Sequence, residues 1–437
     1  MQRNNTFVLL FTLLLVLPGK IFSQTDTAYY LTSPFQVTFF TPPFSSNGLD
    51  NANYVNDISL NLFIGVSGGV DGMELGGFIN VDRYFVRGFQ AAGFGNSVGG
   101  SLDGVQAAGF YNVVGGDARY VQGAGFINVT GGNQYGLQGS GFANVVGNHL
   151  TGLQGAGFVN VVGGTMTGVQ GAGFINVTGG ATSGLQASGF MNVAGAFQSG
   201  VQAAGFGNIS GSGKVNLQAS GFFNVADEVD GAQAAGFINR ARYVKGLQAA
   251  CFINVVDSID GIPVAPFSIV RYNGYQRLEI AASETQYLQA SFRLGVEKFY
   301  TIYGMGKAFG PASRWMYGAG AGTQLPLGAR SFVNIEAMVH HELWMGDDRT
   351  PRFMHHSRLN MVNQLGFTYG MRLGDFAEWF IGPTLNLSIA HIEDTEDSYI
   401  PWEPIAPEWT FTDQTYQAGG RQTNYAFWVG FRGGLRF

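Results

Sequence analysis

The stretch "GVQGAGFINVTGG" at residues 168–180 has a near copy sixteen residues earlier, "GLQGAGFVNVVGG" at 152–164, and another sixteen later, "GLQASGFMNVAGA" at 184–196. Similarity at a fixed period is typical of repeat proteins, whose units complete their cores by packing on their neighbours. The unit places β-branched and aromatic residues between Gly-rich linkers, which indicates strands and turns. We therefore expect stacked β units.

The repeat extends far beyond these three copies. Glutamine recurs every sixteen residues from Gln90 to Gln218, and then every fifteen residues at Gln233 and Gln248. Phe follows each of them four residues later and Asn follows six residues later. Glu74 takes the Gln place one unit earlier, and "PVAPFSIV" at 263–270 reads as a decayed thirteenth copy.

A parallel β-solenoid explains the constant period, because equivalent residues of successive coils then lie above one another. In that arrangement Phe stacks on Phe and Val on Val, and the Gln and Asn side chains form amide ladders. The Gly before each Phe would be a corner without room for a Cβ atom, and the variable residue after Phe would face outward. We interpret the Gln and Asn columns as structural and not as a ligand-binding row.

A large barrel that includes the repeats is the alternative, since nine residues also suffice for a transmembrane β-strand. Three features count against it. The linkers hold one length, whereas barrel loops usually alternate between short and long. The Phe falls in mid-strand instead of at an interfacial girdle, and the lipid-facing side would be mostly Ala and Gly, which gain little from burial.

The N-terminus has the features of a secretory signal peptide over residues 1–23. Arg3 precedes the apolar run "FVLLFTLLLVL", and "IFSQ" supplies a processing site after Ser23. The run is too short for a membrane anchor, so we expect an exported protein. The lone cysteine, Cys251, cannot form an intrachain disulfide. Charged residues make up only 12%, and the net charge of −6 gives no reason to expect a nucleic-acid partner.

The C-terminal third alternates apolar and polar residues, most clearly in "TNYAFWVGFRGGLRF" at 423–437. This alternation and the terminal aromatic residue are typical of an outer-membrane barrel strand. Seven further candidate strands lie at about 276–283, 286–295, 298–306, 314–325, 331–341, 360–373 and 376–390. The inward charges that we expect to pair in a plugged lumen are Arg277, Glu279, Arg293, Glu336, Arg372, Arg432 and Arg436.

Two earlier stretches, "FQVTFFTPP" at 35–43 and "DISLNLFIG" at 57–65, could add a hairpin and raise the count to ten strands. The long connections near 284, 307–313, 342–359 and 391–422 alternate with short ones, and the last strand should descend to the periplasm. An even count then leaves the repeats on the periplasmic side. If "FSIVRYNGY" at 267–275 also crosses the membrane, the repeats lie outside, and the sequence leaves both arrangements open.

Residues that could carry chemistry are few. Two histidine pairs and nearby acidic residues could bind a metal ion: His340, His341, Glu342, Asp347, Asp348, His355 and His356. Spacing alone does not bring three or four ligands together, and adjacent histidines on a strand point to opposite faces. A hydrolase built on His356 and Ser357 lacks a nucleophile motif. The Gly-rich turns are not dinucleotide fingerprints, because no helix follows them. We assign no catalytic residue, metal site or cofactor.

One loop stands out for its composition. The stretch "IEDTEDSYIPWEPIAPEWTFTD" at 392–413 is acidic and carries Trp402 and Trp409. It reads either as a solvated surface loop or as a contact for a partner protein or a glycan.

The unit G-x-Q-x-x-G-F-x-N-V, over about residues 72–260, resembles the repeats of the bacterial surface-repeat outer-membrane proteins of spirochaetes and Bacteroidota. The resemblance implies an exported cell-envelope protein and supplies no activity or catalytic residue. Tyr120 and Asn216 depart from the pattern, because each replaces the Gly before Gln. The "IFSQ" site also resembles Bacteroidota export signals.

The sequence thus predicts an all-β protein in which a β-solenoid of sixteen-residue repeats is joined to a small antiparallel outer-membrane barrel of about 8–10 strands. The expected boundaries are 1–23 for the signal peptide, 24–71 for an N-terminal segment with barrel-strand candidates, 72–270 for the solenoid and 271–437 for the barrel.

Our leading hypothesis is a non-enzymatic outer-membrane protein whose solenoid serves as a scaffold, adhesion or binding surface. The alternatives are a larger channel-forming barrel and a small-barrel lipid or polysaccharide hydrolase. Expected partners are outer-membrane lipid and envelope proteins or glycans, and the sequence does not reveal the oligomeric state.

Overall fold

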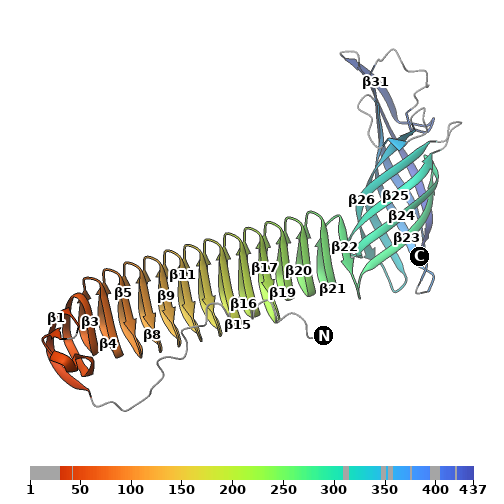
Figure 1. Cartoon of the computed structure of the whole chain (residues 1–437). Coiled ribbons are helices and arrows are strands. Elements are labelled where there is room, and N and C mark those ends of the chain that lie inside the picture. Colours follow the sequence, from red (N-terminus) through yellow and green to blue (C-terminus); the bar gives the residue numbers. More distant parts are fainter. Residues whose placement is uncertain are drawn as a thin grey trace. The chain divides into compact units, whose positions relative to one another are not determined.

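The computed structural model describes residues 30–41, 43–308, 314–345, 351–352, 358–374, 376–393, 404–418 and 421–437. The expected signal peptide lies outside the described residues. The chain divides into two compact units, residues 1–230 and 231–437. The first consists of stacked coils, and the second contains the last coils and an antiparallel barrel (Figure 1).

Each coil contributes two strand segments separated by a bend at the Gly-Phe pair of the repeat. In one coil, β12 (Leu150–Ala156) ends before this bend and β13 (Val159–Val162) begins after it. The other coil strands are β3 (Tyr54–Gly76), β4 (Ile79–Ala92), β5 (Gly95–Val98), β6 (Ser101–Ala108), β7 (Tyr111–Val114), β8 (Ala118–Ala124), β9 (Ile127–Thr130), β10 (Gln134–Ser140), β11 (Ala143–Val146), β14 (Met166–Ala172), β15 (Ile175–Ser188), β16 (Met191–Ala204), β17 (Gly207–Ser210), β18 (Lys214–Ser220), β19 (Phe223–Ala235), β20 (Ile238–Ala250), β21 (Ile253–Val264) and β22 (Phe267–Val270).

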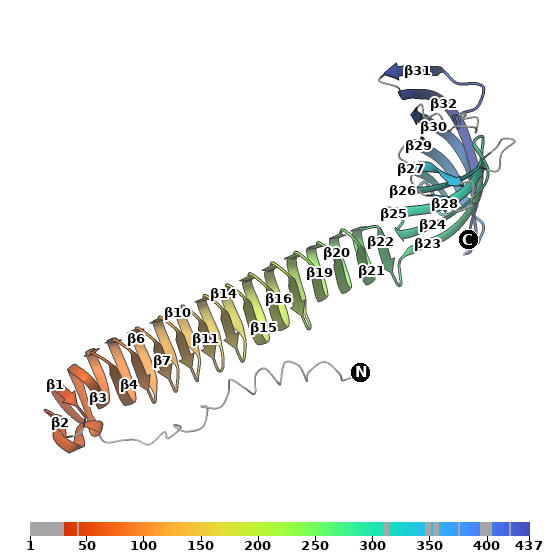
Figure 2. The same cartoon turned by 45° about the horizontal axis from the view of Figure 1, so that its top comes forward.

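Successive coils pair in parallel and in register. Strand β12 pairs with β14 from Leu150↔Met166 to Ala156↔Ala172, and Gln154 lies opposite Gln170. Figure 2 shows these strands side by side along the coils. The expected solenoid is therefore confirmed, with about 13 turns among the described residues. A large barrel that includes the repeats is wrong, because transmembrane barrel strands pair antiparallel.

The glutamines form a buried ladder. From Gln106 to Gln218, each side-chain amide donates to the Oε1 atom of the preceding Gln, as Gln122 does to Gln106 at 2.8 Å and Gln138 to Gln122 at 2.9 Å. The donors therefore point toward lower residue numbers. The last Gln of the row, Gln248, has a buried Oε1 atom without a hydrogen-bond partner, because Pro263 takes the Gln place in the next coil and has no side-chain donor.

The asparagines form a second ladder, in which the donors point toward higher residue numbers. Each Asn also bonds to the other strand segment of the next coil. Asn160 Nδ2 donates to Asn176 Oδ1 of the following coil at 3.0 Å. The same amide donates to the backbone carbonyl of Gly171, the residue after the next Gln, at 2.7 Å. Both N–H groups of the Asn amide are thus used, and both bonds lead to the next coil.

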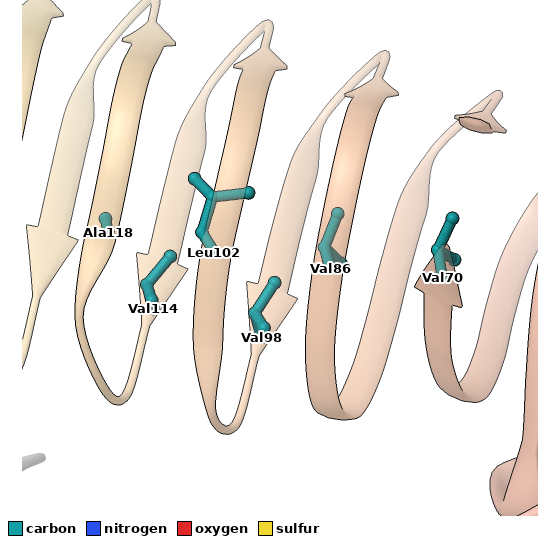
Figure 3. Close-up of a cluster of buried hydrophobic side chains, with 6 residues drawn as sticks. All are labelled: Val70, Val86, Val98, Leu102, Val114 and Ala118. Carbon is teal, nitrogen blue, oxygen red and sulfur yellow. The ribbon is translucent and has the colours of Figure 1, made fainter. Parts of the chain in front are cut away.

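Apolar side chains fill the space that the two amide ladders leave inside the coil. Six of them from successive coils form a buried cluster in the first unit and point inward in Figure 3: Val70, Val86, Val98, Leu102, Val114 and Ala118. Similar positions hold Val146, Leu150, Val162 and Met166 farther along. The coil interior is therefore narrow, with room for a Gln, an Asn and two further side chains.

The Gly before Phe, which only the last copies replace (with Cys251 and Pro266), is required by close backbone approach. A Cβ atom on Gly125 would lie 2.1 Å from the carbonyl oxygen of Gly109 in the coil before it. The Gly before each Gln has a positive φ in most coils, and Tyr120 keeps this conformation in its place with φ of 79°. The corner expected from the sequence is thus confirmed.

The N-terminal stretches proposed as barrel strands belong to the coils instead. Strand β1 (Leu31–Phe40) pairs in parallel with β3, and Gln36 lies opposite Ser59. The short strand β2 (Phe44–Ser45) and the 3-10 helix η1 (Gly48–Asn53) connect β1 to β3. A short segment of alternating apolar and polar residues fits the terminal coil of a solenoid as well as a barrel strand. Its sequence pattern therefore does not distinguish the two.

A buried acidic pair stands where the Gln ladder begins. Glu74 accepts hydrogen bonds from Gln90 at 2.7 Å and from Asn61 at 2.8 Å. Asp82 accepts from Gln90 and Ser67. Burial raises the pKa of Glu74, and burial together with the adjacent Glu74 carboxylate raises the pKa of Asp82 well above its ordinary value. The carboxylate of Glu74 thus accepts the hydrogen bond of Gln90, the first Gln of the ladder, which has no preceding Gln to donate to.

The barrel lies in the second unit. Its eight described strands are β23 (Tyr275–Ser283), β24 (Gln286–Val296), β25 (Phe299–Ala308), β26 (Trp315–Pro326), β27 (Ser331–Met345), β29 (Arg358–Arg372), β30 (Glu378–Glu393) and β32 (Arg421–Arg436). Because β23 pairs antiparallel with both β24 and β32, the sheet closes. Two short strands, β28 (Pro351–Arg352) and β31 (Thr412–Ala418), extend hairpins on β27 and β32. The observed strands begin and end within a few residues of most of the expected ones.

Substituting Asn160→Asp should open the coils around it. The carboxylate cannot donate to Gly171 or Asn176, and it places a charge in the coil interior, so we expect a local loss of about 3 kcal/mol or more. Hydrogen exchange of residues 150–178 measures this loss, with Asn148→Asp on the exposed linker as the control. Unchanged protection in Asn160→Asp would contradict the ladder's structural role.

The acidic pair should make the first coils less stable as pH rises. Both folded pKa values are raised, so stability is fully present below the ordinary values near 4 and is lost as pH rises through the folded values. Exchange protection of residues 54–92 should fall between pH 4 and 8 in the parent protein. The double variant Glu74→Gln with Asp82→Asn should remove this dependence, whereas Asp103→Asn, on the exposed side of β6, should leave it in place.

Candidate functional site

Five charged side chains meet inside the barrel. Strands β23, β24, β27 and β32 alternate inward and outward residues, and each places charges on its inward side: Glu279, Arg293, Glu336, Arg432 and Arg436. All five side chains are at most 2% exposed. Their association confirms this part of the expected lumen.

Two carboxylates bind the three guanidinium groups in a closed network. Arg293 makes a two-point contact with Glu336, with its Nε and Nη2 atoms 3.1 Å from the two carboxylate oxygens. Its Nη2 atom also lies 2.6 Å from Glu279. Arg436 lies 2.7 Å from Glu279 and 2.9 Å from Glu336, and Arg432 bridges the same two acids. Each guanidinium therefore contacts both carboxylates.

Aromatic and apolar side chains close the lumen on both sides of this network. Tyr300 donates to Glu336 at 2.8 Å, and Tyr300 and Tyr275 pack with Ile302 and Met338. On the other side Trp428 is fully buried and donates to Glu284 at 2.8 Å. Trp428 packs there with Met316, Val362, Ala426 and Ile405. The described part of the lumen is thus filled by side chains.

Two of the expected lumen charges lie elsewhere. Arg277 is partly exposed, donates to the carbonyl of Gln276 and covers the Tyr275 ring. Arg372 ends β29 and pairs with Glu297 in the turn after β24 and with Glu378 at 3.5 Å. Both arginines lie at strand ends. The alternation of apolar and polar residues predicts which side of the sheet a side chain faces, but not how far along the barrel axis it lies.

The histidine pairs do not form a metal site in the described residues. His340 is buried in the barrel and His341 is half-buried on the opposite face of β27, as expected for neighbours on a strand. Glu342 is held by Arg314 at 2.6 Å. No cluster of three His, Cys, Asp or Glu side chains occurs among the residues that the structure describes. The other candidates, Asp347, Asp348, His355, His356 and Ser357, lie outside them.

The acidic loop is described only in part. Trp402 lies outside the described residues. Trp409 is 62% exposed, and the segment after it forms β31, which pairs with the end of β32.

The outer face of the coils carries a second feature that could interact with a partner. The Phe of successive repeats stack with ring centroids 4.8 Å apart and nearly parallel planes, as in Phe110–Phe126 and Phe126–Phe142. Most of these rings are 36–44% exposed. Leu or Val before most of the Gln residues forms a column beside them, including the exposed Leu137 at 44% and Leu153 at 49%. We call the side of the coils that bears these two columns the apolar face.

Small residues form a shallow groove between the two columns. Its lining in the first unit is Gly171, Ala172, Ala187, Ser188, Ala203, Ala204, Ala219 and Ser220. The residue after Phe and the Val after Asn, such as Ile175 and Val177, are half-exposed on the adjoining side. The polar amides are therefore buried with a few apolar side chains, while the Phe, Leu and Val columns of the apolar face are exposed.

The apolar face of the last coils meets the outer wall of the barrel within the second unit. The ring of Phe267 stacks on that of Tyr303 with centroids 5.4 Å apart. The Tyr303 hydroxyl and Thr301 Oγ1 donate to the carbonyl of Pro266 at 2.8 and 2.9 Å. Tyr303 pairs with Phe292, which is 41% exposed on the outward side of β24.

Comparisons with known proteins gave no match to a protein-family model, a curated protein or a solved structure. Among the described residues, no helix is long and apolar enough to cross a bilayer.

Removing one acid from the lumen should destabilise the barrel strongly. In Glu336→Gln, three buried guanidinium groups share one remaining acid of the network, which should cost about 3–5 kcal/mol. Urea titration, followed by the shift between folded and unfolded bands on gels, measures the change. Glu297→Gln, which removes a partly exposed partner of Arg372, is the matched control and should cost less than about 1 kcal/mol. Equal effects of the two substitutions would contradict a central role for the network.

Proposed function

We propose that the chain is a non-enzymatic outer-membrane protein whose barrel anchors the coils as a scaffold or binding surface. The network of two acids and three arginines that fills the lumen carries this proposal. A barrel of eight strands has an interior that side chains just fill. The outward residues of its strands are mainly apolar, as on β30 with Ile381, Leu385 and Leu387. An anchor without a pore accounts for both features.

The ends of the strands support one side of the membrane for the coils. The coils enter the barrel at Tyr275, and Leu278 exchanges backbone hydrogen bonds with the C-terminal Phe437. The short turns at 297–298, 327–330 and 373–377 share this end. At the other end the β23–β24 turn at 284–285 is also short, contrary to the long connection expected there, but many more residues separate β25 from β26, β27 from β29 and β30 from β32. Because short turns are periplasmic in outer-membrane barrels, we place the coils in the periplasm.

Planar-bilayer recording tests the sealed lumen. We expect no conductance steps from the parent protein, because the ion-pair network and the aromatic and apolar side chains beside it fill the described part of the lumen. Conductance that persists in purified, folded protein would contradict an anchor and favour a channel.

Labelling of single cysteines in cells tests the sidedness. In a Cys251→Ser background, Gln417→Cys on the exposed β31 hairpin should react with a membrane-impermeant maleimide on intact cells. Lys245→Cys, on the exposed linker side of β20, should react only after the outer membrane is permeabilised. Reaction of Lys245→Cys on intact cells would place the coils outside.

A further inference from the structure

The distribution of charge around the coil is uneven. Eleven consecutive nine-residue copies of the motif, from 89–97 to 247–255, contain a single charged residue, Arg240. The linkers between them carry the other charges of this region, including Arg119, Lys214, Asp230 and Lys245. Because the motif forms the apolar face, the coil has one side suited to water and one side that is not.

The apolar face is too large to be an ordinary patch on a soluble surface. A Phe side chain has about 200 Å² of surface, so at roughly 40% exposure the ten rings from Phe78 to Phe222 leave roughly 800 Å² uncovered. The Leu and Val column adds to this area. Single apolar patches on monomeric proteins usually stay below about 600 Å². Something other than water is therefore expected to cover this face.

The contacts of the last coils indicate which partner that is. Phe237 and Phe252 stack at 4.8 Å, Phe252 meets Phe267 edge-on at 5.5 Å, and Phe267 stacks on Tyr303. The column of Phe rings thus leads to the outward face of β25. That face is the wall of the barrel that contacts lipid under the proposed function. Tyrosines at this level of a barrel wall are typical of the boundary between lipid and water.

We propose that the apolar face of the coils binds lipid at a membrane surface. The Phe, Leu and Val columns enter the acyl-chain boundary, and the charged linkers remain in water. Arg240 is exposed on β20, and its guanidinium binds the lipid phosphates. This inference rests on the proposed function, because it takes the outer wall of the barrel as the lipid-facing surface.

A fluorescent probe on the full chain tests the inference. In the Cys251→Ser background, an NBD group is attached to Leu153→Cys on the apolar face or to Asn148→Cys on the linker side of the same region. The protein is reconstituted into phosphatidylethanolamine–phosphatidylglycerol vesicles. We expect the probe at 153 to shift to the blue and to lose most of its intensity when doxyl-labelled lipids are included. The probe at 148 should show neither change.

A third probe separates this inference from the proposed function. NBD on Leu385→Cys, which points outward from β30, should be quenched by doxyl lipids if the barrel spans the membrane. If this probe escapes quenching, the proposed function fails. If it is quenched while the probe at 153 stays open to aqueous iodide, the lipid-binding face is wrong. A probe at 153 that is shielded from both quenchers means that a second copy of the chain covers the face, which also overturns the proposal.

Discussion

The two N–H groups of the repeat Asn impose the constraint on which the coils depend. One group donates to the next Asn and the other to the carbonyl just after the next Gln, so a single side chain joins two strands of the following coil. Where the period shortens to fifteen, Asn239 donates to Ala249, which again follows a Gln. The motif keeps its position and the linker absorbs the missing residue. Buried amides without such partners would destabilise the coil.

This use of the interior explains why apolar residues appear outside. A narrow coil that contains two amide ladders has little volume left for large side chains, and so Phe and Leu occupy the outer corners. The barrel has the same distribution, with Glu279 and Arg436 inside and Leu278 and Leu435 outside. Both units therefore bury hydrogen-bonded polar groups and leave many large apolar side chains exposed, which is favourable where the surroundings are themselves apolar.

Much of this fold could be predicted from the sequence, because period and alternation act over many residues. The interval between Gln154 and Gln170 gave the parallel register, and alternation in 276–283 gave a barrel strand observed at Tyr275–Ser283. Short or terminal segments were less informative. Alternation predicted a barrel strand at 35–43, where β1 pairs in parallel with β3, and it predicted a lumen position for Arg372, which pairs at the strand ends. The exposure of the Phe column could not be read from spacing alone, since a ring at a tight corner stacks equally well inside or outside.

The opposite directions of the two amide ladders bear on how long such a coil can become. Aligned amides sum their dipoles, but the Gln row, which points toward Glu74, and the Asn row, which points away from it, largely cancel. Adding a coil therefore builds up almost no field along the axis. The terminal residues Glu74 and Pro263 face the same local surroundings whatever number of units separates them. Duplication or deletion of whole sixteen-residue segments is thus an evolutionary route that changes the length of the stacked coils. It requires no change in the residues at either end of the ladder.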